Sequence, residues 1–244
     1  MKKIAYFSYG VLSYALFFGT YCYAVGFVTN LLVPTSLDGV SKVSFVRSFL
    51  INASLLLLFA VQHSVMARPA FKKWWTSIVP EQIERSTYVL FSSICLILLL
   101  WLWEPMGGIV WSVEATPLRI ALTALSFAGF GIVLVSTFMI NHFDLFGLRQ
   151  VWFFLRGQNY RPLKFRTPFF YRYVRHPLYL GWIMAFWAAP TMTLAHFLFA
   201  ALCTGYILIA IQLEEKDLIQ TFGAKYTEYK RNAPMLIPFT KSKK

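Results

Sequence analysis

The chain has 244 residues, of which 58% are hydrophobic and 14% are charged. This composition excludes an ordinary soluble domain, which carries far more charge and less apolar surface. A formal net charge of +13 would fit a nucleic-acid partner if the basic residues formed one block, but they are spread over separate stretches between apolar runs. We therefore expect an integral membrane protein with no nucleic-acid partner.

Five apolar runs are near the length of about 20 residues that a helix needs to cross the hydrocarbon core of a bilayer. In chain order they are residues 4–32, 44–66, 86–103, 118–140 and 194–213. The first run is too long for the apolar region of a signal peptide and has no small-residue cleavage site, so we expect it to be a mature helix.

A sixth apolar segment, residues 178–189, is bounded by Pro177 and Pro190. Its 12 residues would rise about 18 Å as a helix, which is too short to span a bilayer. We expect it to form a helical hairpin with residues 194–213, with residues 190–193 at the tip. The predicted fold is thus an all-α membrane protein of five full transmembrane helices plus one short helix, in a single domain over residues 1–244.

The basic residues follow the predicted loops. Of 23 Lys and Arg, 20 lie at the N-terminus, in residues 67–85, in residues 142–176, or after Leu213. With six segments these four stretches lie on one side of the membrane, and the positive-inside rule makes that side cytoplasmic. We expect both termini in the cytoplasm, with some contact between the basic stretches and anionic membrane lipid.

The longest polar connection, residues 141–176, begins with several side chains that can carry chemistry. His142, Asp144 and Arg149 lie close together in sequence, next to an aromatic stretch that suits the membrane interface. Long structured loops are often functional. We expect this loop to cover a site from the cytoplasmic side, although polar residues at a helix end also serve as ordinary caps.

A motif near the C-terminus points to a binding site. Pro177 suits the first turn of a helix, which places His176 near the N-cap and directs free backbone N–H groups at the cytoplasmic interface, a good position for a carboxylate. Tyr179 lies on a neighbouring face of this helix, and Gly181 allows close backbone approach.

The returning part of the hairpin brings acidic and aromatic residues to a similar depth. Glu214 and Glu215 require a cationic partner there, because adjacent carboxylates at a membrane boundary are costly. Tyr226 and Tyr229, beyond a break at Gly223, are positioned to fold back as aromatic walls, which attract cations. Together these groups describe a pocket for a zwitterionic amino acid that bears an extra positive charge.

These elements resemble the isoprenylcysteine carboxyl methyltransferase and phospholipid methyltransferase superfamily of membrane enzymes. The resemblance rests on Arg175-His176-Pro177-x-Tyr179-x-Gly181, on Glu214-Glu215 and on Gly223-x-x-Tyr226-x-x-Tyr229, and covers about residues 170–239. It implies a cytoplasmic S-adenosylmethionine site between the last helices and the tail. The implied cofactor-binding residues are Arg175, His176, Tyr179, Leu180, Gly181, Glu214, Glu215, Tyr226 and Tyr229.

The rest of the chain is similar to the NnrU-like branch of this superfamily, through residues 62–69 and 84–90. Within that branch, residues 141–150 and 186–193 resemble the bacterial methanethiol S-methyltransferases. The resemblance implies methylation of a small thiol, methanethiol, to dimethyl sulfide, by an enzyme of the bacterial inner membrane.

Transfer of a methyl group to a thiol needs thiolate character at the sulfur and an in-line approach. A base or a positive charge near the sulfur would supply it, so His142, Asp144 and Arg149 are the predicted catalytic residues.

Several alternatives stay open at this point. The acceptor could instead be a prenylcysteine or a phospholipid, and some NnrU-like relatives are haem-dependent isomerases, for which His63, His142 and His196 offer imidazoles. A transporter is disfavoured because the spans lack acidic residues. The three cysteines, Cys22, Cys95 and Cys203, have no metal-binding spacing, so we expect no metal site. The sequence does not indicate an oligomeric state.

Overall fold

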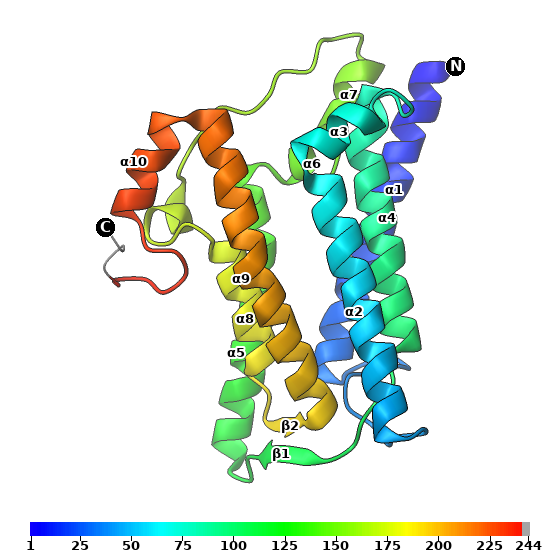
Figure 1. Cartoon of the computed structure of the whole chain (residues 1–244), viewed down its shortest axis with the longest axis vertical. Helices are drawn as coiled ribbons and strands as arrows, with labels where there is room; N and C mark the ends of the chain where they lie inside the picture. The colour runs from blue at the N-terminus through cyan, green and yellow to red at the C-terminus, as the bar shows by residue number, and fades with distance from the viewer. Residues whose placement is uncertain (241–244) are drawn as a thin grey trace. The chain divides into compact units, whose positions relative to one another are not determined.

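The computed structural model describes residues 1–240, which are mostly helical (Figure 1). Five of the helices are long and apolar enough to cross a membrane, which confirms the five predicted spans. They are α1 (Lys2–Thr29), α2 (Phe45–Ala67), α4 (Glu81–Leu102), α5 (Thr116–Ile140) and α9 (Leu194–Phe222). The chain therefore has the long apolar helices of an integral membrane protein.

The chain divides into two compact units. Unit 1 comprises Met1–Gly107 and Asn141–Pro162, and unit 2 comprises Gly108–Ile140 and Leu163–Lys244. The stretch that the sequence assigns to cofactor binding, residues 170–239, lies within unit 2. The expectation of one domain over the whole chain stays a prediction.

In unit 1, α4 packs against α1 and α2, and α7 (Leu148–Leu155) packs against α1 and α4. Small residues make these approaches possible. A Cβ added at Gly10 on α1 would lie 2.6 Å from Val151 of α7, and one added at Gly147 would lie 2.6 Å from Ser86 Oγ of α4. Gly147 also has a φ of +87°, which glycine adopts without strain. The two short helices of this unit are α3 (Pro69–Trp75) and α6 (His142–Leu145).

In unit 1, a buried side-chain amide joins the N-terminal half of α2 to the chain that follows α4. Asn52 is fully buried, its Nδ2 donates to the Glu104 carbonyl at 2.7 Å, and its Oδ1 accepts from the Glu104 N–H at 2.9 Å. Because both polar groups of the amide are satisfied, its burial inside an apolar helix bundle carries little penalty. Asn52 thus fixes the chain that leaves α4.

In unit 2, α5 packs against α8 (Pro177–Trp187), and α9 also packs against α8. Two glycines bring α5 and α8 into backbone contact: a Cβ at Gly129 would lie 2.6 Å from Gly181 O, and one at Gly181 would lie 2.7 Å from Gly129 O. Ser126 of α5 donates to the Ala185 carbonyl at 2.8 Å. This close packing fixes the position of α8, whose first turn carries the predicted binding motif.

The predicted helical hairpin of α8 and α9 is present, with two differences. The tip contains a short strand, β2 (Thr191–Thr193), which pairs antiparallel with β1 (Ile109–Ser112). Strands of three and four residues are too short to show a periodic pattern in sequence. Helix α9 also continues past the apolar run to Phe222, because no helix-breaking residue occurs before Gly223, whose φ is +59°.

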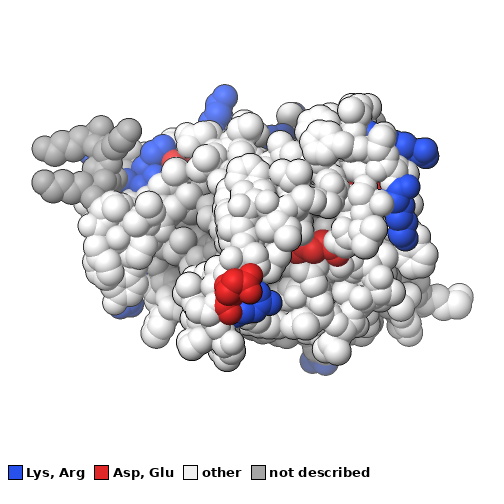
Figure 2. Space-filling view, turned by 90° about the horizontal axis from the view of Figure 1, so that it is seen from below, with Lys and Arg blue, Asp and Glu red and all other residues white. Residues whose placement is uncertain are grey.

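Charged side chains are distributed unevenly. The face in Figure 2, seen from below the view of Figure 1, is mostly uncharged. In the chain, the loops at residues 33–43 and 104–117 hold a single basic residue, Lys42. Under the positive-inside rule these loops face away from the cytoplasm, and this orientation stays a prediction.

Candidate functional site

The start of α8 has the geometry that the sequence predicts. His176 is the N-cap residue and Pro177 occupies the first turn, where its missing N–H needs no partner. The C-terminal tail lies beside this junction, since the Arg175 N–H donates to the Pro234 carbonyl at 2.9 Å and the His176 N–H donates to the Met235 carbonyl at 3.2 Å. The tail and the motif therefore form one substructure of unit 2.

Glu215 of α9 is the centre of a buried ionic cluster. The residue is 2% exposed, its Oε1 accepts from Arg175 Nε at 2.7 Å and lies 3.1 Å from His176 Nε2, and its Oε2 lies 2.7 Å from Lys230 Nζ. A buried carboxylate is tolerated when it is paired and hydrogen-bonded in this way. Glu215 thus ties α9 to the start of α8 and to α10 (Ala224–Asn232).

Arg175 extends this cluster to the tail. The residue is 8% exposed, and its Nη1 donates to the carbonyl oxygens of Lys230, at 3.0 Å, and of Ala233. A guanidinium has five N–H donors in a fixed fork, so one side chain can join a carboxylate and two carbonyls. Arg175 therefore holds the segment after α10 against the motif.

Glu214 has different surroundings from its neighbour. Its side chain is 41% exposed, its Oε2 accepts from Tyr179 Oη at 2.9 Å and lies 3.9 Å from His176 Nδ1. Its Oε1 has no hydrogen-bond partner within residues 1–240. The protein thus uses Glu215 internally and leaves Glu214 able to face a cationic ligand.

The tail tyrosines fold back as predicted, at different levels of burial. Tyr226 is 2% exposed and packs against Phe165 and Tyr229, with ring centroids 5.8 Å away in both cases. Its Oη is buried and has no hydrogen-bond partner among the described residues. Tyr229 Oη donates to the Tyr171 carbonyl at 2.5 Å. Burial raises the pKa of Tyr171, Tyr226 and Tyr229, so all three hydroxyls stay protonated at neutral pH.

Two further residues of the motif have structural contacts. Gly181 faces α5 through the contact with Gly129 described above, which accounts for its lack of a side chain by helix packing. The Leu180 N–H donates to the His176 carbonyl at 3.1 Å and belongs to the first turn of α8. Their predicted roles in cofactor binding stay predictions.

The predicted catalytic residues all lie in unit 1, at α6 and α7. His142 is 2% exposed, and its Nε2 lies 2.9 Å from Tyr14 Oη of α1. Its ring packs edge-on against Phe146, with centroids 4.8 Å apart. Burial lowers the pKa of His142, so the imidazole is neutral at pH 7.

Asp144 is engaged by two neighbours in the same unit. Its Oδ1 accepts from Arg149 Nη1 at 2.9 Å and from Tyr160 Oη at 3.0 Å. Burial and the Asp144 carboxylate raise the pKa of Tyr160 to about 12, so this hydroxyl donates at neutral pH. The Arg149 guanidinium also lies over the rings of Phe153 and Tyr160, at 5.1 and 5.4 Å from their centroids. Asp144 therefore has two donors already.

The other two histidines considered as haem ligands also contact protein groups. In unit 1, His63 lies within hydrogen-bond distance of Tyr88 Oη and Ser92 Oγ. In unit 2, His196 Nε2 lies 2.9 Å from the Phe186 carbonyl. These contacts satisfy both imidazoles within apolar helices without a ligand role.

Sequence reasoning missed four residues that complete these clusters. Lys230 and Tyr171 join the motif in unit 2, whereas Tyr14 and Tyr160 join the α6 region in unit 1. Lys230 follows Tyr226 by four residues, a helical spacing that could have placed both on one side of α10. For Tyr14, the signal in the sequence is a hydroxyl group within an otherwise apolar run.

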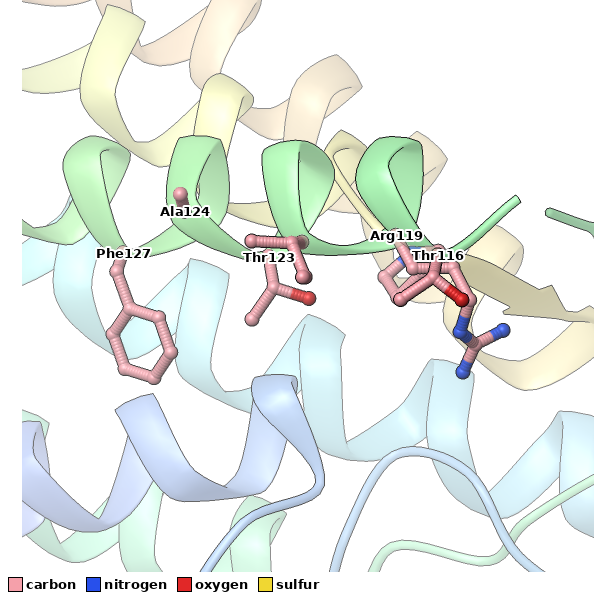
Figure 3. A pocket seen from close by; sticks show the side chains of 7 residues that line it. Thr116, Arg119, Thr123, Ala124 and Phe127 are labelled. Carbon is pink, nitrogen blue, oxygen red and sulfur yellow. The ribbon is translucent and has the colours of Figure 1, made fainter. Parts of the chain in front are cut away.

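A separate hollow of about 460 Å³ lies on α5 in unit 2, away from the motif (Figure 3). It is lined by Thr116, Arg119, Ile120, Thr123, Ala124, Phe127 and Pro190. In Figure 3 the labelled side chains extend from the same side of α5. None of the predicted site residues lines this hollow.

Comparison with known proteins decides the family. The model of the phospholipid methyltransferase family matches residues 118–225. The chain is 55% identical to a methanethiol S-methyltransferase of Crocosphaera subtropica, over 95% of the chain and 91% of that protein. The chain belongs to the methanethiol S-methyltransferase family. No solved structure matches it significantly.

Other relatives extend this comparison. A methanethiol S-methyltransferase of Mycobacterium tuberculosis is 48% identical, over 98% of both chains. Nurim of Rattus norvegicus is 33% identical over 72% of the chain and 70% of its own length. The matched phospholipid methyltransferase region contains α5, α8 and α9 of unit 2, whereas similarity to the methanethiol S-methyltransferases also includes α1, α2 and α4 of unit 1.

Proposed function

We propose that this membrane enzyme transfers a methyl group from S-adenosylmethionine to methanethiol and so forms dimethyl sulfide. The observation that carries the proposal is the similarity to methanethiol S-methyltransferases along nearly the whole chain, at 48% and 55% identity. That length includes both the phospholipid methyltransferase region and the α6 and α7 segment with the predicted catalytic residues.

The residues at the motif fit S-adenosylmethionine. When bound, this cofactor supplies a methyl group on a positively charged sulfur next to an amino acid moiety. Glu214 has a free oxygen for a cationic group, Tyr226 has an unpaired buried hydroxyl, and the N–H groups at the start of α8 suit a carboxylate. These groups all lie in unit 2, together with Tyr179 and His176.

The ionic cluster orients these groups instead of contacting the reacting atoms. Glu215 fixes the His176 ring through Nε2, and its contact with Lys230 holds α10, which carries Tyr226. A site whose side chains are held by neighbouring hydrogen bonds loses less entropy on binding. We therefore assign Glu215 and Arg175 a positioning role, and Glu214 the direct contact.

The thiol proton needs an acceptor, and the two candidates from the sequence are His142 and Asp144. The Asp144 carboxylate already accepts hydrogen bonds from Arg149 and Tyr160, so it is engaged with protein donors. His142 is neutral and can accept a proton. We therefore favour His142 as the proton acceptor, with Asp144 and Arg149 fixing the segment that carries it.

A phospholipid or prenylcysteine acceptor is the second candidate, because residues 118–225 match the phospholipid methyltransferase family. Methanethiol is a small apolar thiol, whereas the alternatives are long and need access from lipid. Purified protein is incubated with labelled S-adenosylmethionine and each acceptor in turn. We expect volatile dimethyl sulfide from methanethiol. Methylation of the prenylcysteine analogue or the phospholipid, without methylation of any short thiol, would refute the assignment.

We also propose that the enzyme lies in the bacterial inner membrane with both termini and residues 142–176 in the cytoplasm. Single cysteines introduced at Ser36, Gly108 and Gln158 in a cysteine-free background test this. A membrane-impermeant reagent applied to intact cells from the periplasmic side should label Ser36→Cys and Gly108→Cys but not Gln158→Cys. Labelling of the Gln158 position would contradict the proposed topology.

A further inference from the structure

Unit 1 contains a hydrogen-bonded pair that extends the proposed function. Tyr14 lies in the middle of α1, and its Oη lies 2.9 Å from Nε2 of His142, the first residue of α6. The ring centroids are 5.6 Å apart and the ring planes are nearly perpendicular, at 86°. A phenol and an imidazole in direct contact can pass a proton between them.

The two members of the pair differ in accessibility. His142 is 2% exposed, whereas Tyr14 is half-buried. A substrate that approaches this pair therefore reaches the phenol before the imidazole. Direct removal of a thiol proton by His142 would require the surrounding side chains to move.

The surroundings of Tyr14 suit a small apolar thiol. Four phenylalanine rings have centroids 6.2–6.4 Å from the Tyr14 ring: Phe17, Phe18, Phe143 and Phe146. Sulfur makes favourable contacts with aromatic rings, often at a ring edge. These rings offer such contacts to the sulfur, and the Tyr14 hydroxyl offers a polar partner to the S–H group.

The charged groups on neighbouring elements are otherwise engaged. Arg85 of α4 donates to the Leu145 carbonyl at 2.7 Å, and Asp144 and Arg149 pair with each other. These interactions leave burial as the effect that lowers the pKa of His142. The neutral imidazole can then accept a proton from Tyr14 at neutral pH.

Building on the proposed function, we propose that Tyr14 takes the proton from the thiol while its own proton passes to His142. The S–H bond breaks as a new O–H bond forms on Tyr14, and the previous Tyr14 proton binds His142 Nε2. The sulfur electron pair forms the new C–S bond with the donor methyl carbon. The bond from that methyl to the donor sulfur breaks and leaves its electrons on the donor sulfur. The proton on His142 then returns to Tyr14 as the half-buried Tyr14 hydroxyl releases its own proton to water.

The variant Tyr14→Phe tests this role, because it removes the hydroxyl and keeps the ring. The matched control is Tyr9→Phe on the same helix, where the lost hydroxyl donates to Thr87 Oγ1 at 3.0 Å and contacts no histidine. At neutral pH we expect kcat of Tyr14→Phe to fall by about 10²-fold or more, the usual contribution of acid–base catalysis. The affinity of Tyr14→Phe for S-adenosylmethionine and the kcat of Tyr9→Phe should both stay near the wild-type values. Raising the pH should partly restore Tyr14→Phe, because more of the thiol is ionised in solution.

A second measurement does not depend on activity. In protein labelled with ¹⁵N-histidine, the Nε2 resonance of His142, assigned with His142→Gln, should shift in Tyr14→Phe and stay unchanged in Tyr9→Phe. An unshifted Nε2 resonance would refute the contact. A near-normal kcat in Tyr14→Phe, or a loss that is equal at every pH, would refute the relay while wild-type methylation of methanethiol still stands. Failure of the wild type to methylate any short thiol would instead refute the proposed function.

Discussion

The two adjacent glutamates should respond differently to the same substitution, because one is buried among protein cations and the other faces outward. Glu215→Gln removes the charge that pairs with Arg175, His176 and Lys230. Glu214→Gln removes a charge whose protein contacts are the Tyr179 hydroxyl and a more distant His176 nitrogen. We expect Glu215→Gln to destabilise the fold and Glu214→Gln to weaken the donor complex.

The magnitudes follow from burial. Loss of one partner from a buried ion pair costs about 3–5 kcal/mol, and since a glutamine still accepts hydrogen bonds, we expect about 3 kcal/mol for Glu215→Gln. For a chain of this size that lowers the apparent Tm by about 6–12 °C. A hydrogen bond to a charged group contributes about 1.5–3 kcal/mol, so Glu214→Gln should weaken S-adenosylmethionine binding about 10- to 150-fold.

Thermal unfolding and calorimetric titration in detergent measure the two effects separately. Glu228→Gln is a suitable control, because Glu228 is an exposed carboxylate of α10 outside the ionic cluster, and it should change neither quantity. An unchanged Tm in Glu215→Gln would show that the buried cluster does not stabilise the unit. Unchanged donor affinity in both glutamate variants would refute the proposed cofactor site.

Three further outcomes follow from the packing and from the titration of His142. Gly181→Ala should lower the Tm strongly, because its Cβ would lie 2.7 Å from Gly129 O. Gly205→Ala is the control, because the added methyl meets open space and should leave the Tm unchanged. Equal Tm values for the two variants would contradict the close contact of α5 and α8. Stability should fall as the pH drops below about 6.5, since the unfolded imidazole of His142 takes up a proton there and the folded one does so at lower pH. His142→Gln should reduce this slope in pH-dependent unfolding, and an unchanged slope would count against a buried neutral imidazole. Asp144→Ala should lower the Tm with partial retention of turnover, because its partners hold the segment in place; a loss of about 10⁴-fold at an unchanged Tm would instead identify Asp144 as the base.

The long helices could be predicted from the sequence because length and hydrophobicity are local properties of a run. The five spans and the short helix after Pro177 follow from this, as does the N-cap position of His176. The pairing of β1 with β2 could not be predicted, because it joins two very short segments that are distant in sequence. Hydropathy places the end of α9 too early, because a helix continues through polar residues until a breaker occurs.

The candidate site was predictable as a set of residues and less so as a set of roles. The motif brought together Arg175, His176, Glu214 and Glu215, and the structure places them in one cluster. Sequence does not tell which of two adjacent carboxylates points inward, since that depends on packing of α9 against its neighbours. It also missed Tyr14, because its partner His142 lies 128 residues away.

The most direct test of the proposed function is methyl transfer by the purified protein in detergent. With S-adenosylmethionine labelled at the methyl group, methanethiol should yield labelled dimethyl sulfide in the headspace, and the Glu214→Gln variant should need a higher donor concentration to reach the same rate. The absence of labelled dimethyl sulfide from a protein that binds S-adenosylmethionine would contradict the assignment of methanethiol as the acceptor.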